Sequence, residues 1–194
     1  MMKNVLLIAV LFFSLLSGCI RSEEKKTPVV PTPVPAVIEH SNKLESDQGP
    51  YYDGLIEEFR TTLAEDPNNF AALVGLGNAY FDSGQWKKAV VMYEHALAIN
   101  PRNADVRTDM GTAYRNLGMP DRALAEYRAV LVEEPGHLNA RYNMGIVFAH
   151  DKKNYQAAIH IWKELLKLSP NFPYADHIRA SIAALEKRNV KESR

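Results

Sequence analysis

The sequence predicts an all-α fold, a solenoid of paired helices, and two periodic features indicate it. The first is a large apolar residue followed by glycine and, three positions later, by an aromatic ring. It occurs three times at steps of 34 residues: Leu76-Gly77-x-x-Tyr80, Met110-Gly111-x-x-Tyr114 and Met144-Gly145-x-x-Phe148. The second is a set of alanine, tyrosine and proline residues that repeat at the same step: Ala89, Tyr93, Pro101, Ala123, Tyr127 and Pro135. A constant period near 34 residues is typical of helical-hairpin repeats.

Each of these landmarks has a physical reason. Leu76, Gly77 and Tyr80 share one stripe of a helix, and a glycine on that stripe lets the partner helix come close. A proline at the end of each repeat stops the second helix, because the residue before a proline avoids helical backbone angles. We therefore expect two helices in every repeat, with Asn103 as the N-cap of the helix that follows it.

The third copy and the two ends depart from the regular repeat. In the third copy the later landmarks come one residue late, so we expect one extra residue in the loop at 149–154. Residues 54–65 predict the second helix of a degenerate leading repeat. Residues 174–188 predict a capping helix, which a solenoid needs to cover its last repeat. About eight helices and no strand follow from this pattern.

The landmarks resemble those of the tetratricopeptide repeat family, over roughly residues 70–170. The resemblance implies a right-handed solenoid of about three repeats, with a leading half-repeat and a C-terminal capping helix. It also implies a function in protein–protein interaction. In the proteins that this chain resembles, a second stripe of each first helix lines a concave groove, which holds a peptide or a protein segment.

Carrying that groove over by position gives a set of expected peptide-binding residues. They are Asn78, Phe81, Asp82, Asp105, Thr108, Asp109, Thr112, Arg115, Asn116, Asn139, Tyr142, Asn143, Ile146 and His150. We expect Arg115 to be the one cation of this stripe, facing the aspartates, and Tyr142 to lie off the packing positions. The lysine-rich clamp of chaperone-binding relatives is missing, since Val74 stands where its first lysine belongs.

The N-terminus predicts export and a lipid anchor. Residues 1–18 have the order of a signal peptide, with Lys3, an apolar stretch too short to span a bilayer comfortably, and small residues at the end. Leu16-Ser17-Gly18-Cys19 resembles the lipobox of bacterial lipoproteins. The resemblance implies an acyl chain such as palmitate on Cys19 and, because Ile20 follows, an outer-membrane position facing the periplasm. The alternative is an ordinary signal peptide with an incidental cysteine.

A tether is predicted between the lipid and the folded domain. Residues 19–50 begin with charged residues, continue with prolines at every second or third position and end at Gly49-Pro50. Such spacing favours an extended polyproline II conformation. We therefore expect the tetratricopeptide domain over residues 51–188 and a short polar tail over residues 189–194.

Charge and composition exclude several classes of function. The chain has 23 basic and 23 acidic residues, so it lacks the basic surface that a nucleic-acid partner requires. The histidines are scattered and no pair has the spacing of a metal site on one helix. No phosphate-binding loop and no catalytic triad occur. We predict no enzyme activity, no cofactor, no metal and no small-molecule substrate.

The sequence thus predicts a membrane-anchored scaffold or adaptor in the bacterial cell envelope. Its partner would be another envelope protein or peptide segment, held in the groove. One alternative is a structural lipoprotein that self-associates through stacked repeats. Another is an accessory subunit of an envelope assembly or secretion complex. The sequence does not name the partner.

Overall fold

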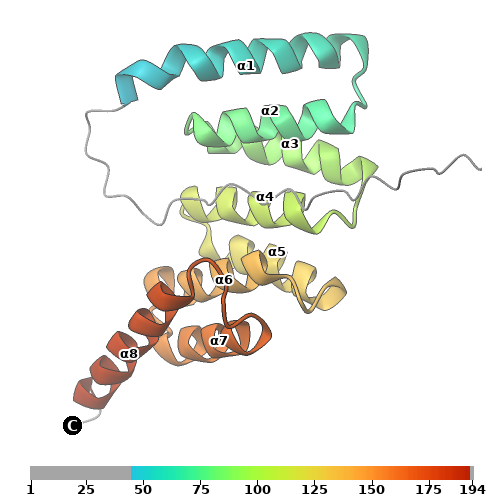
Figure 1. The fold of residues 1–194 in the computed structure, drawn as a ribbon. Coiled ribbons are helices and arrows are strands. Elements are labelled where there is room, and N and C mark those ends of the chain that lie inside the picture. Colours follow the sequence, from blue (N-terminus) through green and yellow to red (C-terminus); the bar gives the residue numbers. More distant parts are fainter. Residues whose placement is uncertain (1–44, 193–194) are drawn as a thin grey trace, which may run out of the picture. The chain divides into compact units, whose positions relative to one another are not determined.

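The computed structural model describes residues 45–192, with side chains for residues 51–188. This part contains no strand. Its elements are α1 (Glu45–Glu65), α2 (Phe70–Asp82), α3 (Trp86–Ile99), α4 (Ala104–Asn116), α5 (Pro120–Glu133), α6 (Leu138–Ile146), the π-helical turn η1 (Val147–Asp151), α7 (Tyr155–Leu168) and α8 (Ala175–Glu192). Figure 1 shows successive helices stacked one beneath another from α1 to α7. The predicted all-α repeat fold is confirmed.

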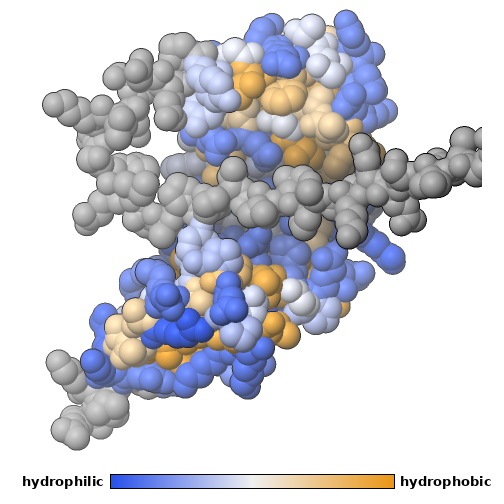
Figure 2. Space-filling model, viewed as in Figure 1, coloured by the Kyte–Doolittle hydropathy of each residue, from blue (hydrophilic) through white to orange (hydrophobic). Residues whose placement is uncertain are grey.

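The helices form three hairpins and two flanking half-repeats. α2 packs with α3, α4 with α5, and α6 with α7, and each second helix also packs with the first helix of the next repeat. At the ends, α1 packs on α2 and α8 packs on α7. Figure 2 shows apolar residues in the region of α1 and α2, bordered by hydrophilic ones. The apolar contact here joins Ile56 and Phe59 of α1 to Leu76 and Ala79 of α2.

Polar caps set where the first helices begin. The side chain of Asn69 accepts a hydrogen bond from the amide of Ala72 at 3.0 Å, before α2. Asn103 accepts from the amide of Val106 at 2.9 Å, which confirms its predicted role before α4. His137 serves in the same way before α6, where its Nδ1 accepts a hydrogen bond from the amide of Ala140. An N-cap of this kind satisfies one of the free amides of the first turn.

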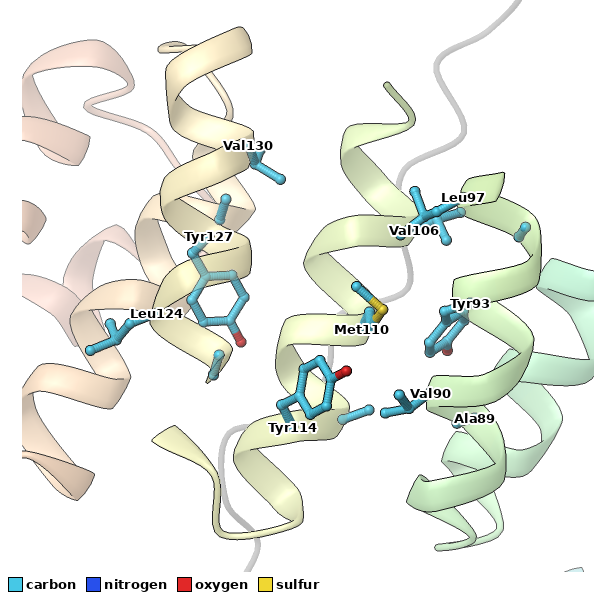
Figure 3. Packing of buried hydrophobic residues seen from close by; sticks show 14 of the residues in the cluster. Ala89, Val90, Tyr93, Leu97, Val106, Met110, Tyr114, Leu124, Tyr127 and Val130 are labelled. Atoms are coloured by element: carbon cyan, nitrogen blue, oxygen red, sulfur yellow. The ribbon is translucent and has the colours of Figure 1, made fainter. Parts of the chain in front are cut away.

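A glycine and an aromatic ring set the spacing of the two helices in each hairpin. A Cβ atom added at Gly77 would lie 2.6 Å from a ring carbon of Tyr93, and one at Gly111 would lie 2.7 Å from a ring carbon of Tyr127. Both tyrosines are almost fully buried. Figure 3 shows the tyrosine rings between α3, α4 and α5. The predicted close approach of each helix pair therefore rests on the absence of a side chain at these positions.

The extra residue of the third repeat does not lengthen a loop. It is absorbed in η1, where the amide of Lys152 donates to the carbonyl of Val147, five residues back. A π turn has one more residue than an α turn, so it takes up a one-residue insertion while the helix continues. The expectation of an extra loop residue at 149–154 is therefore corrected to a π-helical turn at 147–151.

Two helix boundaries also differ from the expectation. α1 begins at Glu45, whereas the predicted helix begins at residue 54 and the predicted domain at residue 51. α8 begins at Ala175 and continues to Glu192, beyond the predicted end at residue 188. Its buried face, with Ile178 and Ile182, covers the last hairpin as the predicted cap should.

Several predictions lie outside the described residues. They are the signal peptide at 1–18, the lipid attachment at Cys19, the tether as far as residue 44 and the last two residues of the tail. Within residues 45–192, no helix has both the length and the apolar content that crossing a membrane would require.

Candidate functional site

The candidate site is the face of α2, α4 and α6 that carries the predicted peptide-binding residues, and we call it the first-helix face. Most of these side chains are exposed or half-buried in the structure. They are Asn78, Phe81, Asp82, Asp105, Asp109, Arg115, Asn116, Asn139, Asn143, Ile146 and His150. The remaining three, Thr108, Thr112 and Tyr142, are buried.

The two threonines are buried and hydrogen-bonded within the domain, so they are not available to a ligand. The hydroxyl of Thr108 donates to the carbonyl of Ala104 at 2.8 Å. The hydroxyl of Thr112 lies 3.1 Å from that of Tyr127 and accepts a hydrogen bond from Nδ2 of Asn143 at 3.2 Å. Their predicted place in the binding surface is corrected to a structural one, because Thr108 bonds within α4 and Thr112 bonds to the neighbouring helices α5 and α6.

Tyr142 belongs to the core of the third repeat and the cap. Its ring stacks on that of Tyr174, with centroids 5.1 Å apart, and lies 5.6 Å from the ring of Phe172. Only 7% of Tyr142 is exposed. The expectation that this residue lies off the packing positions is therefore wrong, since the segment before α8 folds over it.

Arg115 does not face the aspartates of the first-helix face. Its Nε donates to the carboxylate of Asp151 at 2.6 Å, and 18% of its side chain is exposed. Asp151 is the last residue of η1, so the π turn supplies the partner that the sequence does not reveal. The expected arrangement, with Arg115 opposite Asp82, Asp105 and Asp109, is corrected accordingly.

The first-helix face carries three carboxyl groups on α2 and α4, those of Asp82, Asp105 and Asp109. Burial, together with the charges of Asp105 and Asp82, raises the pKa of Asp109 to about 7. His137 acts in the opposite direction on this carboxyl group. His137 Nε2 also lies 3.2 Å from Asp105, and this hydrogen bond lowers the pKa of Asp105. The local charge is therefore negative, with one imidazole as the nearby basic group.

Asn78 belongs to the same face. Its Oδ1 accepts a hydrogen bond from the hydroxyl of Tyr93 at 2.8 Å. The pKa of Tyr93 is raised first by burial and then by the charges of Asp109 and Asp82. The sequence interpretation of Tyr93 as a core residue misses this bond. In the next repeat Thr112 and Tyr127 are also 15 residues apart, and their hydroxyl groups lie within hydrogen-bonding distance. This shared spacing is the signal that could have revealed the bond between Asn78 and Tyr93.

The surface shows hollows elsewhere, and they are shallow. One lies between α4 and α5 and is lined by Pro101, Arg107 and Val132, among others. Another lies at the turns beside Trp86 and Leu117. Neither includes a residue of the first-helix face, which is open and suits an extended segment better than an enclosed small molecule. Among the described residues, no three His, Asp or Glu side chains are grouped to hold a metal ion.

The fold and this open face define a helical-repeat protein. Models of the TPR repeat and of the tetratricopeptide repeat match residues 77–118 and residues 108–175. Residues 77–175 thus consist of tetratricopeptide repeats, and repeats of this kind generally mediate protein–protein interaction. No curated protein matches the sequence.

Solved structures share the fold. One structure of MamA is 18% identical with a TM-score of 0.59, and the match covers 77% of this chain and 96% of the MamA chain. A second structure of MamA is 21% identical with a TM-score of 0.64, and the match covers 74% of this chain and 77% of the MamA chain. The tetratricopeptide domain of Arabidopsis OM64 is 22% identical, covers 61% of this chain and 95% of its own, and gives a TM-score of 0.56. At these identities the similarity shows the fold alone.

Proposed function

We propose that this chain is a membrane-anchored adaptor of the bacterial cell envelope that binds a peptide or protein segment on the first-helix face. The main observation is that this face carries amide and carboxyl groups that make no hydrogen bond to the described part of the chain. The Nδ2 atom of Asn78 and the carboxylate of Asp109 are two such groups. An extended segment offers the carbonyl and amino groups that these side chains can bind.

The proposed anchor rests on the sequence of the N-terminus. Leu16-Ser17-Gly18-Cys19 supplies a lipidation site, and the residues that follow provide the tether. An extended chain rises about 3 Å per residue, so this tether would let the domain reach partners several tens of ångströms from the membrane. Two or three acyl chains would hold the protein at the membrane far better than one.

Acyl labelling tests the anchor. The wild-type chain should incorporate labelled palmitate and sediment with membranes, and Cys19→Ser should lose both properties. A matched control is the double variant Cys19→Ser/Ser41→Cys, which returns a cysteine outside the lipobox and should not restore labelling. A wild-type chain without label, or a Cys19→Ser chain that keeps it, contradicts the anchor.

Capture from solubilised membranes tests the binding face. Asn78→Ala with Asn139→Ala removes two amides from the first-helix face, and we expect the double variant to lose its partner. Lys87→Ala with Lys187→Ala removes two exposed side chains elsewhere and should leave capture unchanged. Equal capture by both variants would place the binding surface elsewhere. Recovery of further copies of this chain alone would favour the self-associating alternative.

A further inference from the structure

The N-cap of α6 differs chemically from the caps of the two preceding repeats. Asn69, Asn103 and His137 occupy the same repeat position, and each side chain accepts a hydrogen bond from the amide three residues later. The amide oxygen of an asparagine does not titrate, whereas histidine changes its charge between about pH 5 and pH 8. Of these three caps, the one before α6 can therefore respond to pH.

Two hydrogen bonds determine which nitrogen of His137 carries the proton. Its Nδ1 accepts from the amide of Ala140 at 3.1 Å, so this nitrogen is unprotonated. Its Nε2 lies 3.2 Å from Oδ1 of Asp105 on α4, so the neutral ring carries its proton there and donates it to the carboxylate. Only 11% of the His137 side chain is exposed. The imidazole thus caps α6 and contacts α4 at the same time.

A second proton on the ring breaks one of these bonds and strengthens the other. On Nδ1 the proton removes the lone pair that the amide of Ala140 needs. It also places a cation at the positive end of the α6 dipole, where a cation is destabilising. The bond from Nε2 to Asp105 remains and becomes an ion pair, because the ring is then charged. Protonation therefore favours the contact with α4 over the cap of α6.

Charged groups near this ring come from the neighbouring elements. On α4, Asp105 bonds to the imidazole and Asp109 interacts with it electrostatically. Glu134 is the C-cap of α5, and Arg141 lies in α6, from where its charge also acts on Glu164 of α7. The carboxylates favour the charged ring, and the first turn of α6 favours the neutral ring. The charge of the ring therefore decides which element it holds.

We propose that His137 is a pH-sensitive cap: the neutral imidazole holds the first turn of α6, and protonation of the imidazole releases that turn. Asn139 lies in this turn and belongs to the first-helix face, so the third repeat's part of that face becomes more mobile in acid. The caps of α2 and α4 are asparagines, so these helices keep their first turns. The inference rests on the proposed function, because it names a way in which the binding face is regulated.

An NMR titration of the full-length, isotope-labelled chain in detergent micelles tests the proposal between pH 8 and pH 5. At pH 8 the imidazole nitrogen shifts should show the proton on Nε2. As the ring takes up its second proton, the protection of the Ala140 amide against exchange, relative to its intrinsic rate, should fall about fivefold, the usual effect of losing an N-cap. The backbone order of Asn139, measured by relaxation, should fall with it. The amide of Ala72, which is bonded to Asn69, is the internal control and should keep its protection.

His137→Asn is the matched variant, because asparagine caps α2 and α4 at the same repeat position. In this variant the protection of the Ala140 amide should be the same at pH 8 and pH 5. Asp109 also titrates in this range, since its pKa is about 7. Asp109→Asn should therefore leave the loss of protection at Ala140 in place, which assigns the effect to the imidazole.

Three results would overturn the pH-sensitive cap. They are a proton on Nδ1 at pH 8, an Ala140 amide that keeps its protection once the ring is charged, and an equal loss of protection in His137→Asn. None of these measurements involves a partner, so each leaves the proposed function in place. Equal capture by the Asn78→Ala/Asn139→Ala variant, in turn, would contradict the binding face and leave the cap as it is.

Discussion

At the scale of single residues, close contacts between glycine and aromatic rings determine how near the paired helices lie. Gly111 shows this clearly, because Tyr127 fills the space where a side chain would stand. The ring cannot withdraw, since Tyr127 is fully buried among the neighbouring helices. A larger residue at position 111 must therefore move a helix.

Gly111→Leu should lower the free energy of unfolding by about 1–3 kcal/mol, the usual cost of overpacking a core. Lys87→Leu, at an exposed position of α3, should change it by less than about 0.5 kcal/mol. Urea denaturation of both variants measures the difference. Equal stabilities would show that the assigned repeat register does not describe the packing.

Tyr142→Ala should be strongly destabilising, because the ring is buried against Phe172 and Tyr174. Loss of a large buried aromatic side chain costs about 3–5 kcal/mol. Asn139→Ala, one turn earlier on the same helix and half-buried, is the matched control and should cost far less. If Tyr142→Ala unfolds at the same urea concentration as the wild type, the aromatic cluster does not stabilise the cap.

Asp109→Asn should stabilise the domain, and the gain should depend on pH. The pKa of Asp109 is about 7 in the folded state and 3.8 in the reference state, so the folded state loses stability as the pH rises from about 4 to 7. The increase in melting temperature should therefore be larger at pH 8 than at pH 5. A pH-independent difference between the two proteins would contradict the assigned burial.

At the scale of helices, the capping helix α8 completes the last repeat. Ile178 is fully buried on its inner face, where it covers the hairpin of α6 and α7. Without such a cover the apolar side of a terminal repeat would be open to water. The stability of the C-terminal end therefore depends on a helix that lies outside the three repeats.

Ile178→Ala should lower the free energy of unfolding by about 2–5 kcal/mol, the cost of removing most of a buried isoleucine. Lys187→Ala, on the exposed side of the same helix, should have little effect. Hydrogen exchange would show faster amide exchange in α7 and α8 for the isoleucine variant alone. If the amides of α7 and α8 exchange at the same rates in both variants, α8 does not protect the last repeat.

The helices themselves could be predicted well because their causes are local. Asn103 and the repeated prolines fix where helices begin and end through bonds and clashes within a few residues. The π turn at Val147–Asp151 could not be predicted, because one extra residue fits equally well in a loop. The contact between Asp151 and Arg115 joins residues 36 positions apart, and the 34-residue period does not predict such a tertiary hydrogen bond.

At the scale of the whole molecule, the 34-residue period predicts the fold but only part of the candidate site. Position in the repeat predicts that Asn78, Asp82 and Asp109 are not part of the core, and their side chains are exposed or half-buried in the structure. It fails for Tyr142, because burial of that ring depends on the chain that crosses it before α8. A repeat position thus predicts which face a side chain points to, and the neighbouring segments decide whether that face remains open.

The central claim is that the first-helix face is where a partner binds. Site-specific photo-crosslinking in the native host tests it most directly. One crosslinker replaces Ala71, which lies two helical turns before Asn78 on α2, or His150; another replaces Val132 on the second-helix side, and all three positions are exposed. We predict one envelope protein crosslinked from Ala71 and His150 and none from Val132. Crosslinks from Val132 alone, or crosslinks only to other copies of this chain, would contradict the claim.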